Sequence, residues 1–423
     1  MTSALRRALP ALLAALASAF LLSASPAHAA RGMEIGVQDD AQFLSSSDSA
    51  RAAAFAHARK LGVSALRVNL PWARVVSDAS APAAPAALSY DLTAYDRAVD
   101  EAAANGIRVQ ITLAGPAPAW ATANHKISSD HPDPARFAEF AGAMAAHFAG
   151  RVRALSIWNE PNWHGLLAPE RICGRVAKVE RPKKAHGRGH GKPKKKGDAS
   201  RKRMVKTCVK TSARVYRALY VAGYAAIKAA APSMPVWMGE TNPYVNRRNQ
   251  STAPLLWLRQ LACADGIVKG CTGVLRADGY AHHPYAFDRA PSKSRGGADD
   301  VTIATLGNLT KQLSKLRSRI RIAGGSIYLT EFAYYSSGPN AQPEKKRADW
   351  TRKAFEIALK APKVRQLLYY QLVDPPTSAT WRTGLVTASG TLHPAYGALV
   401  AFAQKRRAAL AKPGGPLALP AAR

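Results

Sequence analysis

The chain has 423 residues, 47% of them hydrophobic, and a formal net charge of +33 that comes from 60 Lys and Arg against 27 Asp and Glu. This hydrophobic content is enough for a large core, and the length fits either two domains or one large α/β barrel. The positive charge favours anionic partners, namely wall polymers, acidic polysaccharide, a membrane surface or nucleic acid. The four cysteines include no Cys-x-x-Cys pair, which argues against a zinc ribbon or a thioredoxin-like redox site.

Residues 1–29 have the pattern of a secretory signal peptide. Arg6 and Arg7 give a positive start, residues 9–22 form an apolar run, and Ala27-His28-Ala29 is a small-x-small cleavage site. The alternative is a membrane anchor, but the apolar run is short for a membrane span. We therefore expect a secreted, extracellular protein without a membrane anchor.

Strand-like apolar runs then alternate with helix-like segments. The expected strands are short and apolar, as strands buried on both faces should be, and cover 33–38, 65–70, 107–113, 154–159, 235–239, 277–283, 326–330 and 365–372. The expected helices cover 48–60, 92–104, 134–148, 212–230, 253–264, 301–316, 345–359 and 393–407. Eight such units in a row predict a single-domain (β/α)8 TIM barrel over residues 30–411. A doubly wound sheet is the rival fold, but no glycine-rich phosphate turn follows an early strand.

A long basic insertion follows the fourth strand. Residues 171–210 hold sixteen Lys and Arg against only Glu180 and Asp198. The low-complexity stretch 178–206 predicts a disordered loop, and the Pro/Gly/Ala-rich tail 412–423 is also expected to be disordered. The loop could bind an anionic polymer, although a solvated insertion without a partner is the simpler interpretation. Nucleic acid is disfavoured because the protein is expected to be exported and the stretch has no aromatic residues for base stacking.

Export makes disulfides possible. Pairing the cysteines in sequence order, Cys173 with Cys208 and Cys263 with Cys271, would close two local loops. This is one of three possible connectivities, and the sequence alone does not choose between them.

Two glutamates occupy strand ends. The fourth strand ends in "SIWNEPNWHG", which contains Glu160, and the seventh in "SIYLTEFAYY", which contains Glu331. The carboxyl ends of barrel strands form the active site in this fold. A pair of carboxyl groups, one protonated and one ionised, can cleave a glycosidic bond. The sequence therefore predicts a glycosidase site at the barrel mouth.

Other strand-end residues are candidates for substrate binding. The second strand carries Arg67, the fifth ends in Glu240, and the sixth leads to His283 and Tyr285. Four tryptophans lie just beyond strands, where indole faces could stack on sugar rings: Trp72, Trp120, Trp163 and Trp381.

The segment "IWNEPN" resembles the Asn-Glu signature of the clan A glycoside hydrolases, and "YLTEF" resembles their nucleophile strand. These are retaining enzymes on (β/α)8 barrels. The detail is most similar to families 39 and 5, and the resemblance spans residues 33–402. It implies that Glu160 is the acid/base and Glu331 the nucleophile. It also implies that Asn159 binds the sugar 2-hydroxyl, that Arg67, His283 and Tyr285 surround the nucleophile, and that Trp381 forms the floor of the subsite.

Each role has an alternative. Glu160 could cap a helix, His283 could be a core histidine, Arg67 could be structural, and Trp72 and Trp120 could only seal loops. Glu240 could be a third substrate ligand, or the true acid. The alternative for the whole protein is a non-catalytic secreted barrel that binds anionic polysaccharide. No metal-ligand spacing is visible, and neither a metal nor a cofactor is expected.

Overall fold

The computed structural model of the protein describes residues 33–411 apart from 180–201, 246–250, 377 and 380. The expected signal peptide (1–29), the tail (412–423) and most of the expected disordered loop lie outside the described residues, so those expectations remain predictions. Within the described ranges, no helix is both long enough and apolar enough to cross a bilayer.

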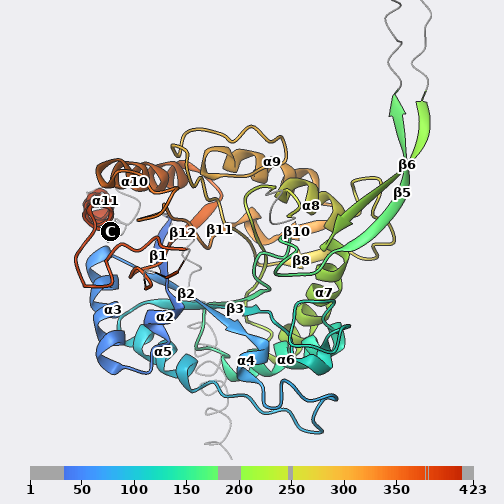
Figure 1. Cartoon of the computed structure of the whole chain (residues 1–423), viewed down its shortest axis with the longest axis horizontal. Helices are drawn as coiled ribbons and strands as arrows, with labels where there is room; N and C mark the ends of the chain where they lie inside the picture. The colour runs from blue at the N-terminus through green and yellow to red at the C-terminus, as the bar shows by residue number, and fades with distance from the viewer. Residues whose placement is uncertain (1–32, 180–201, 246–250, 377, 380, 412–423) are drawn as a thin grey trace, which may run out of the picture.

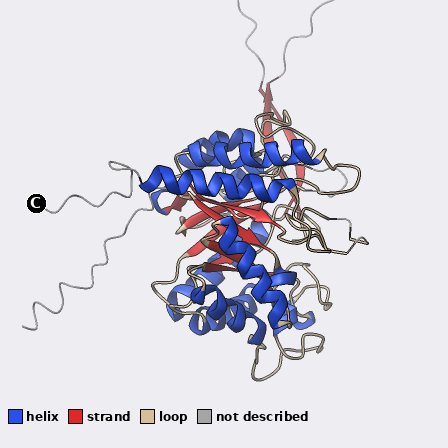
Figure 2. Cartoon of the chain, turned by 90° about the vertical axis from the view of Figure 1, so that its left-hand side faces the viewer, coloured by secondary structure: helices blue, strands red, loops and turns tan. Residues whose placement is uncertain are grey.

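Eight parallel strands close into a barrel, and helices surround it (Figure 1; Figure 2). Around the barrel the strands are β1 (Glu34–Gln38), β2 (Ala65–Pro71), β3 (Arg108–Ala114), β4 (Ala154–Ile157), β7 (Val236–Thr241), β9 (Gly279–His282), β11 (Ile327–Leu329) and β12 (Val364–Tyr370). The outer helices are α3 (Asp48–Leu61), α5 (Thr93–Ala104), α6 (Pro134–His147), α7 (Ala213–Ala230), α8 (Pro254–Leu261), α9 (Leu306–Lys315), α10 (Glu344–Lys360) and α11 (Pro394–Ala411). The predicted (β/α)8 barrel is confirmed.

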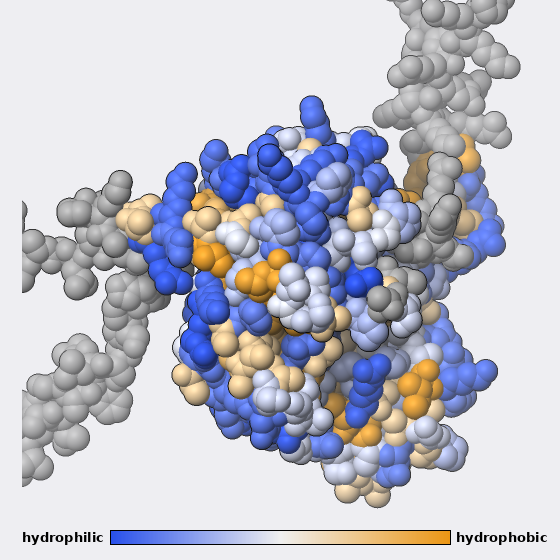
Figure 3. Space-filling model, turned by 60° about the vertical axis from the view of Figure 1, so that its left-hand side comes forward, coloured by the Kyte–Doolittle hydropathy of each residue, from blue (hydrophilic) through white to orange (hydrophobic). Residues whose placement is uncertain are grey.

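Smaller elements decorate the barrel. The short helices α2 (Asp40–Phe43) and α4 (Trp72–Val75) follow β1 and β2 directly, and β8 (Leu275–Ala277) pairs with β10 (Ile320–Ile322) in a separate two-stranded sheet. Over the face drawn in Figure 3, hydrophilic side chains predominate and hydrophobic ones are scattered among them. This is the usual surface of a folded domain whose large apolar side chains are mostly buried.

Local sequence sets where the helices begin and end. The Ser47 side chain accepts a hydrogen bond from the Ala50 amide at the start of α3, and Gly62 ends that helix in the left-handed conformation at φ 70°. Asp133 accepts from the amides of Ala135 and Arg136 at the start of α6, and Pro134 occupies the first turn. These caps fix the loops that lead from the strand ends into the helices.

The insertion after β4 is partly a β-ribbon. Strands β5 (Glu170–Val179) and β6 (Lys202–Thr211) pair in antiparallel fashion and project beyond the ring of helices (Figure 1). The expectation of a disordered loop over 178–206 is therefore wrong at both ends, where residues 178–179 and 202–206 belong to paired strands. The sequence signal was ambiguous there, because the lysine-rich composition suggests disorder while valines alternate with polar residues along both strands.

Both predicted disulfides are confirmed. Cys173 bonds to Cys208 across the β5–β6 ribbon, with Cα atoms 4.0 Å apart. Cys263 bonds to Cys271 in the segment between α8 and β8. The first bond joins residues 35 apart in the sequence and so ties the two strands of the insertion together.

Candidate active site

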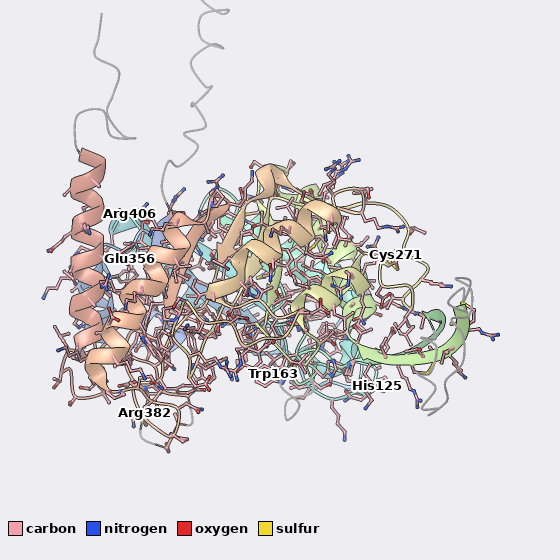
Figure 4. The ribbon with its side chains drawn as sticks, turned by 90° about the horizontal axis from the view of Figure 1, so that it is seen from above. His125, Trp163, Cys271, Glu356, Arg382 and Arg406 are labelled. Carbon is pink, nitrogen blue, oxygen red and sulfur yellow. A yellow bond between two sulfur atoms is a disulfide. The ribbon has the colours of Figure 1, made fainter. Side chains whose placement is uncertain are left out.

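A cavity of about 560 Å³ lies at the carboxyl ends of the barrel strands. Glu160 and Glu331 both line it, so the strand ends that the sequence singled out meet at one place. The other lining residues come from the strand ends and from the loops that follow: Asn69, Asn159, Trp163, Leu166, Asn242, Tyr244, Tyr285, Phe287, Asp288, Arg295, Tyr335, Asn340, Tyr370 and Trp381. In Figure 4, Trp163 and Arg382 lie along one edge of the barrel, which is the edge of this mouth.

Glu331 follows β11 and is held by three neighbours. One Oε accepts from Arg67 Nη1 at 2.6 Å, and the other accepts from the Tyr285 hydroxyl at 2.8 Å. His283 Nδ1 lies 3.6 Å from the same carboxylate. Burial alone would raise the pKa of Glu331, but the positive charges of His283 and Arg67 and the two hydrogen bonds hold that pKa below its usual value. Glu331 is therefore ionised at neutral pH.

Glu160 follows β4, which is separated from β11 by the two strands β7 and β9. Its Oε1 lies 2.9 Å from His283 Nδ1, and Asn242 Nδ2 donates to its Oε2 at 3.4 Å. The Glu160 amide donates to the Glu240 carbonyl at 3.1 Å. Three residues here have positive backbone φ angles: 42° at Glu160, 65° at Trp158 and 50° at Glu240. Residues other than glycine rarely adopt such values. Such strain concentrates at functional sites, where surrounding contacts hold a side chain in one orientation.

His283 joins the two carboxylates. The ring is fully buried, and burial disfavours its charged form. The nearby carboxylates of Glu331 and Glu160 outweigh that effect, so the pKa of His283 is raised above its usual value. A carboxylate oxygen of Glu160, one of Glu331 and a ring nitrogen of His283 all lie within 4.8 Å of one another. This spacing is close to the roughly 5–5.5 Å between carboxyl groups in retaining glycosidases and shorter than the roughly 6.5–9.5 Å of inverting ones.

Arg67 is the centre of a buried network beneath the cavity. Its guanidinium donates to Glu331, to the Glu240 carboxylate and to Asn159 Oδ1, the last at 2.8 Å. Thr112 Oγ1 bridges Arg67 Nε and Glu240 Oε1, at 2.9 Å from each. Because the Asn159 carbonyl oxygen is already engaged by a cation, its amide NH₂ is left to face the cavity as a donor.

Aromatic side chains form one wall of the cavity. Trp381 meets Tyr285 and Phe287 edge to face, each at a centroid distance of 5.5 Å, and lies 5.0 Å from Tyr335. Burial first, and then the Glu331 carboxylate, raise the pKa of Tyr285 well above its usual value, so its hydroxyl remains a donor. Broad aromatic faces beside a polar floor suit the mixed apolar and hydroxylated surface of a sugar.

The structure separates the predicted site residues into two groups. Asn159, Trp163, Tyr285 and Trp381 line the cavity with the two glutamates. Three residues predicted to bind substrate, Arg67, His283 and Glu240, are fully buried behind that lining and contact the glutamates or one another. Arg67 and His283 lie beside Glu331, as the resemblance implies, and all three residues help to hold the two glutamates in place; direct contact of these three with a substrate stays a prediction.

Two predicted tryptophans are elsewhere. Trp72 is fully buried and stacks on Phe140 at 5.3 Å, so the prediction that it contacts sugar is wrong; α4 begins at this residue and turns the indole into the core. Trp120 packs edge to face on Trp72 and lines a different cavity, of about 1000 Å³, between the loop after β3 and α7. It is therefore no part of the mouth that contains the glutamates.

Sequence reasoning missed the loop residues of the cavity: Asn242, Tyr244, Phe287, Asp288, Arg295, Tyr335 and Asn340. Phe287 stands two residues beyond Tyr285 in "AHHPYAF", so that alternation was a usable signal. Arg295 and Asn340 come from loops far from any strand end, and no repeating pattern in the sequence predicts that they reach the cavity.

Glu160, His283 and Glu331 are also the one group of potential metal ligands that the structure brings together in its described part. Arg67 and Tyr285 occupy the Glu331 oxygens and Glu160 occupies His283 Nδ1, while His283 Nε2 is buried without a hydrogen-bond partner. A guanidinium within the same cluster also disfavours a second cation. The trio is thus arranged to hold protons and charge and does not form a metal cage.

Comparison with known proteins agrees with this fold. No protein-family profile matches the sequence. A stretch of 137 residues, 31% of this chain, is 35% identical to the thermostable beta-glucosidase B of Thermobispora bispora and covers 27% of that enzyme. The chain thus matches about a quarter of the length of that curated relative.

Solved structures give broader matches. A family 39 glycoside hydrolase from Bacteroides cellulosilyticus aligns over 88% of this chain and 64% of its own, just under two thirds, with a TM-score of 0.57 and 16% identity. A GH5_18 protein from Streptomyces cattleya, solved in complex with GlcNAc, aligns over 90% and 82% with a TM-score of 0.57 and 16% identity. The chain therefore has the (β/α)8 fold of the clan A glycoside hydrolases of families 39 and 5.

Proposed function

We propose that the protein is a secreted retaining glycoside hydrolase that cleaves O-glycosidic bonds of a poly- or oligosaccharide, with Glu331 as the nucleophile and Glu160 as the acid/base. The observation that carries the proposal is the pair of carboxyl groups, on β4 and β11, whose oxygens lie within 4.8 Å across the cavity. The two glutamates also have different surroundings: Arg67 and Tyr285 bind Glu331 only, while Asn242 binds Glu160 only. Such a difference lets one carboxylate attack while the other carries a proton.

In the first step, a Glu331 oxygen attacks the anomeric carbon and forms a glycosyl ester. The bond from that carbon to the leaving oxygen breaks, and its electron pair takes the proton that Glu160 donates. In the second step, Glu160 removes a proton from water, the water oxygen bonds to the anomeric carbon, and the ester electrons return to Glu331. Two inversions give net retention.

The remaining groups position these reactants. Arg67 stabilises the negative charge of Glu331 before attack and after release of the sugar. His283 contacts both carboxylates and so couples the proton of Glu160 to the charge of Glu331. The free NH₂ of Asn159 can donate to the sugar 2-hydroxyl, a contact that strengthens in the transition state of retaining enzymes. Trp381 and its aromatic neighbours offer a stacking face for the ring.

Export is part of the proposal. The pattern of residues 1–29 supports export. The described residues contain two disulfides and no free cysteine, as is typical of proteins in an oxidising, extracytoplasmic compartment. The sugar is left open, and β-glucosides belong in the first substrates tried because the curated relative is named a beta-glucosidase.

An aryl-glycoside and polysaccharide panel tests the activity, and proton NMR of the first product tests the stereochemistry. We expect retention of anomeric configuration, and loss of turnover in Glu331→Gln. Glu139→Gln is the matched control, since this half-exposed glutamate lies on α6 and pairs only with Arg136. An inverted anomer as first product, or wild-type activity in Glu331→Gln, would contradict the assignment.

A further inference from the structure

The exposed face of the β5–β6 ribbon carries paired cations. The strand register places Arg171 opposite Lys210 and Arg175 opposite Lys206, with the Cys173–Cys208 disulfide between the two pairs. Directly opposed residues point to the same side of an antiparallel pair, and all four cationic side chains are exposed. We call these four residues the cationic face.

The opposite side of the ribbon rests on the protein. Ile172, Val176, Val205 and Val209 alternate with the cationic residues and are half-buried. Gly174 lies against the segment that follows α8: a Cβ there would sit 3.3 Å from the Ile267 backbone. The ribbon is thus held by its apolar side, and the cationic face is turned to solvent.

This arrangement is unfavourable without a partner. Like charges directly opposite each other destabilise an antiparallel pair, and the face repeats that juxtaposition twice. Glu170 is the single acidic residue of the two strands, and it pairs with Arg214 at 3.2 Å instead. Within the described ranges, none of the four cations forms an ion pair. The disulfide between the two pairs holds the strands together against this repulsion.

The ribbon also grows directly from the candidate active site. Trp163 and Leu166 line the cavity, and β5 begins four residues later at Glu170. At the far end of β6, the Ser212 hydroxyl donates to the carbonyl of Pro161, the residue after Glu160. The base of the cationic face is therefore joined to the cavity lining by a short segment of chain.

We propose that the cationic face binds an anionic polysaccharide, one that bears carboxylate or sulfate groups, and holds the barrel on it. The choice of a glycan rests on the proposed glycosidase function. The geometry offers two cation pairs about 13 Å apart along the strands, each pair about 5 Å across. Nucleic acid fits less well, because β5 and β6 contain no aromatic side chain for base stacking.

Binding is measured on the Glu331→Gln background, so that the polymer is not consumed. The probes are polygalacturonate, dextran sulfate, uncharged dextran and duplex DNA at equal charge concentration. We expect Arg175→Glu with Lys206→Glu to raise the Kd for the two anionic glycans at least about tenfold. Raising NaCl from about 50 mM to about 300 mM should weaken wild-type binding strongly, because exposed charges are screened. Uncharged dextran should not bind.

Lys311→Glu with Arg317→Glu is the matched control, with the same change in charge at two exposed positions on or just after α9. It should change the Kd less than about twofold. An equal loss in this control, stronger binding to DNA than to the glycans, or no binding to either anionic glycan would overturn the proposal.

A single substitution separates binding from folding. Lys206→Glu places a carboxylate opposite Arg175, so the melting temperature should stay constant or rise while binding weakens. Unchanged binding in this stable variant would also overturn the proposal. With Glu331 intact, all ribbon variants should keep wild-type kcat/KM on a small aryl glycoside. If no glycoside is hydrolysed by any form, the proposed function fails while the binding result stands on its own.

Discussion

Each end of the barrel contains one arginine that is fully or largely buried, Arg67 at the mouth and Arg153 opposite, and the two have different surroundings. At the mouth, Arg67 contacts the carboxylates of Glu331 and Glu240 and the polar side chains of Thr112 and Asn159. At the opposite end, Arg153 pairs with one carboxylate, that of Glu34, at 2.6 Å, and lies over the rings of Trp237 and Tyr328 at 5.3 and 5.6 Å.

The difference separates function from stability. Arg153 has one carboxylate partner, Glu34, which also pairs with Arg108. It also has a cation–π contact, and Gln366 and Gln110 extend its hydrogen bonds across the barrel. Arg67 faces more negative charge than one guanidinium carries, because Asp40 lies near it in addition to Glu240 and Glu331. Burial raises the pKa of Asp40 to about 6. Carboxylates crowded at the carboxyl ends of strands are unfavourable for folding and useful for chemistry.

The largest effect should come from Glu331→Ala. Removing the proposed nucleophile should lower kcat about 10⁴-fold or more, because the proposed glycosyl ester can no longer form. The melting temperature at neutral pH should fall only modestly, because the contacts of ionised Glu331 are lost while Glu240 still pairs with Arg67. Measuring kcat and melting temperature together tests both statements. Glu34→Ala is the comparison at the other end, and it should lower stability without changing kcat. A Glu331→Ala variant that keeps retaining turnover would contradict the assignment.

Arg67→Met and Arg153→Met compare the two ends directly. At the mouth, the substitution leaves Glu331 and Glu240 buried without their cation, which should cost about 3–5 kcal/mol of unfolding free energy. Activity should be lost as well, because the pKa of Glu331 then rises. Arg153→Met should lower stability by less, since methionine keeps part of the packing on Trp237, and kcat should hold. Denaturant titration and steady-state kinetics measure these effects. A loss of kcat in Arg153→Met would contradict the proposal that the mouth serves activity and the opposite end serves stability.

The sequence predicted the barrel better than the mouth. Strands of a parallel barrel are buried on both faces, so each appears in the sequence as a short apolar run. All eight strands were therefore located to within a few residues. Glu160 and Glu331 were found because the backbone geometry of the fold brings strand ends together. Trp72 was misplaced because the first turn of α4, which the sequence did not reveal, directs its ring inward. Arg295 reaches the cavity from a loop and stacks on Tyr244 at 4.3 Å, a contact that depends on the tertiary fold alone.

The pH dependence of stability should also distinguish the two ends. The pKa of Glu331 is lowered in the folded protein, so its contribution is present above about pH 4.5 and is lost as the pH falls through the folded pKa. The pKa of His283 is raised, so its contribution is complete below pH 6.5 and is lost as the pH rises through the folded pKa. Melting temperature should therefore be highest between these values. Glu331→Gln should remove the acid loss and reduce the alkaline one, because the charge of Glu331 is the largest factor that raises the pKa of His283. His283→Asn should remove the alkaline loss, whereas Arg153→Met should keep both. An unchanged profile in the two mouth variants would contradict this.

The smallest effect concerns two tryptophans that follow barrel strands, one that lines the mouth and one that lies outside it. Trp381 lines the cavity beside Tyr285 and Phe287, while Trp120 lies against Trp72 and faces the separate cavity near α7. Trp381→Ala should raise KM about tenfold on an aryl glycoside, since an aromatic contact is worth about 1 kcal/mol beyond the area it buries. Trp120→Ala removes a side chain of the same size without touching the glutamates, so its KM should stay within about twofold of wild type. Both variants should fold, because each indole is only partly buried. Equal KM changes would mean that the substrate extends from the mouth to the cavity beside α7, so that both cavities bind it.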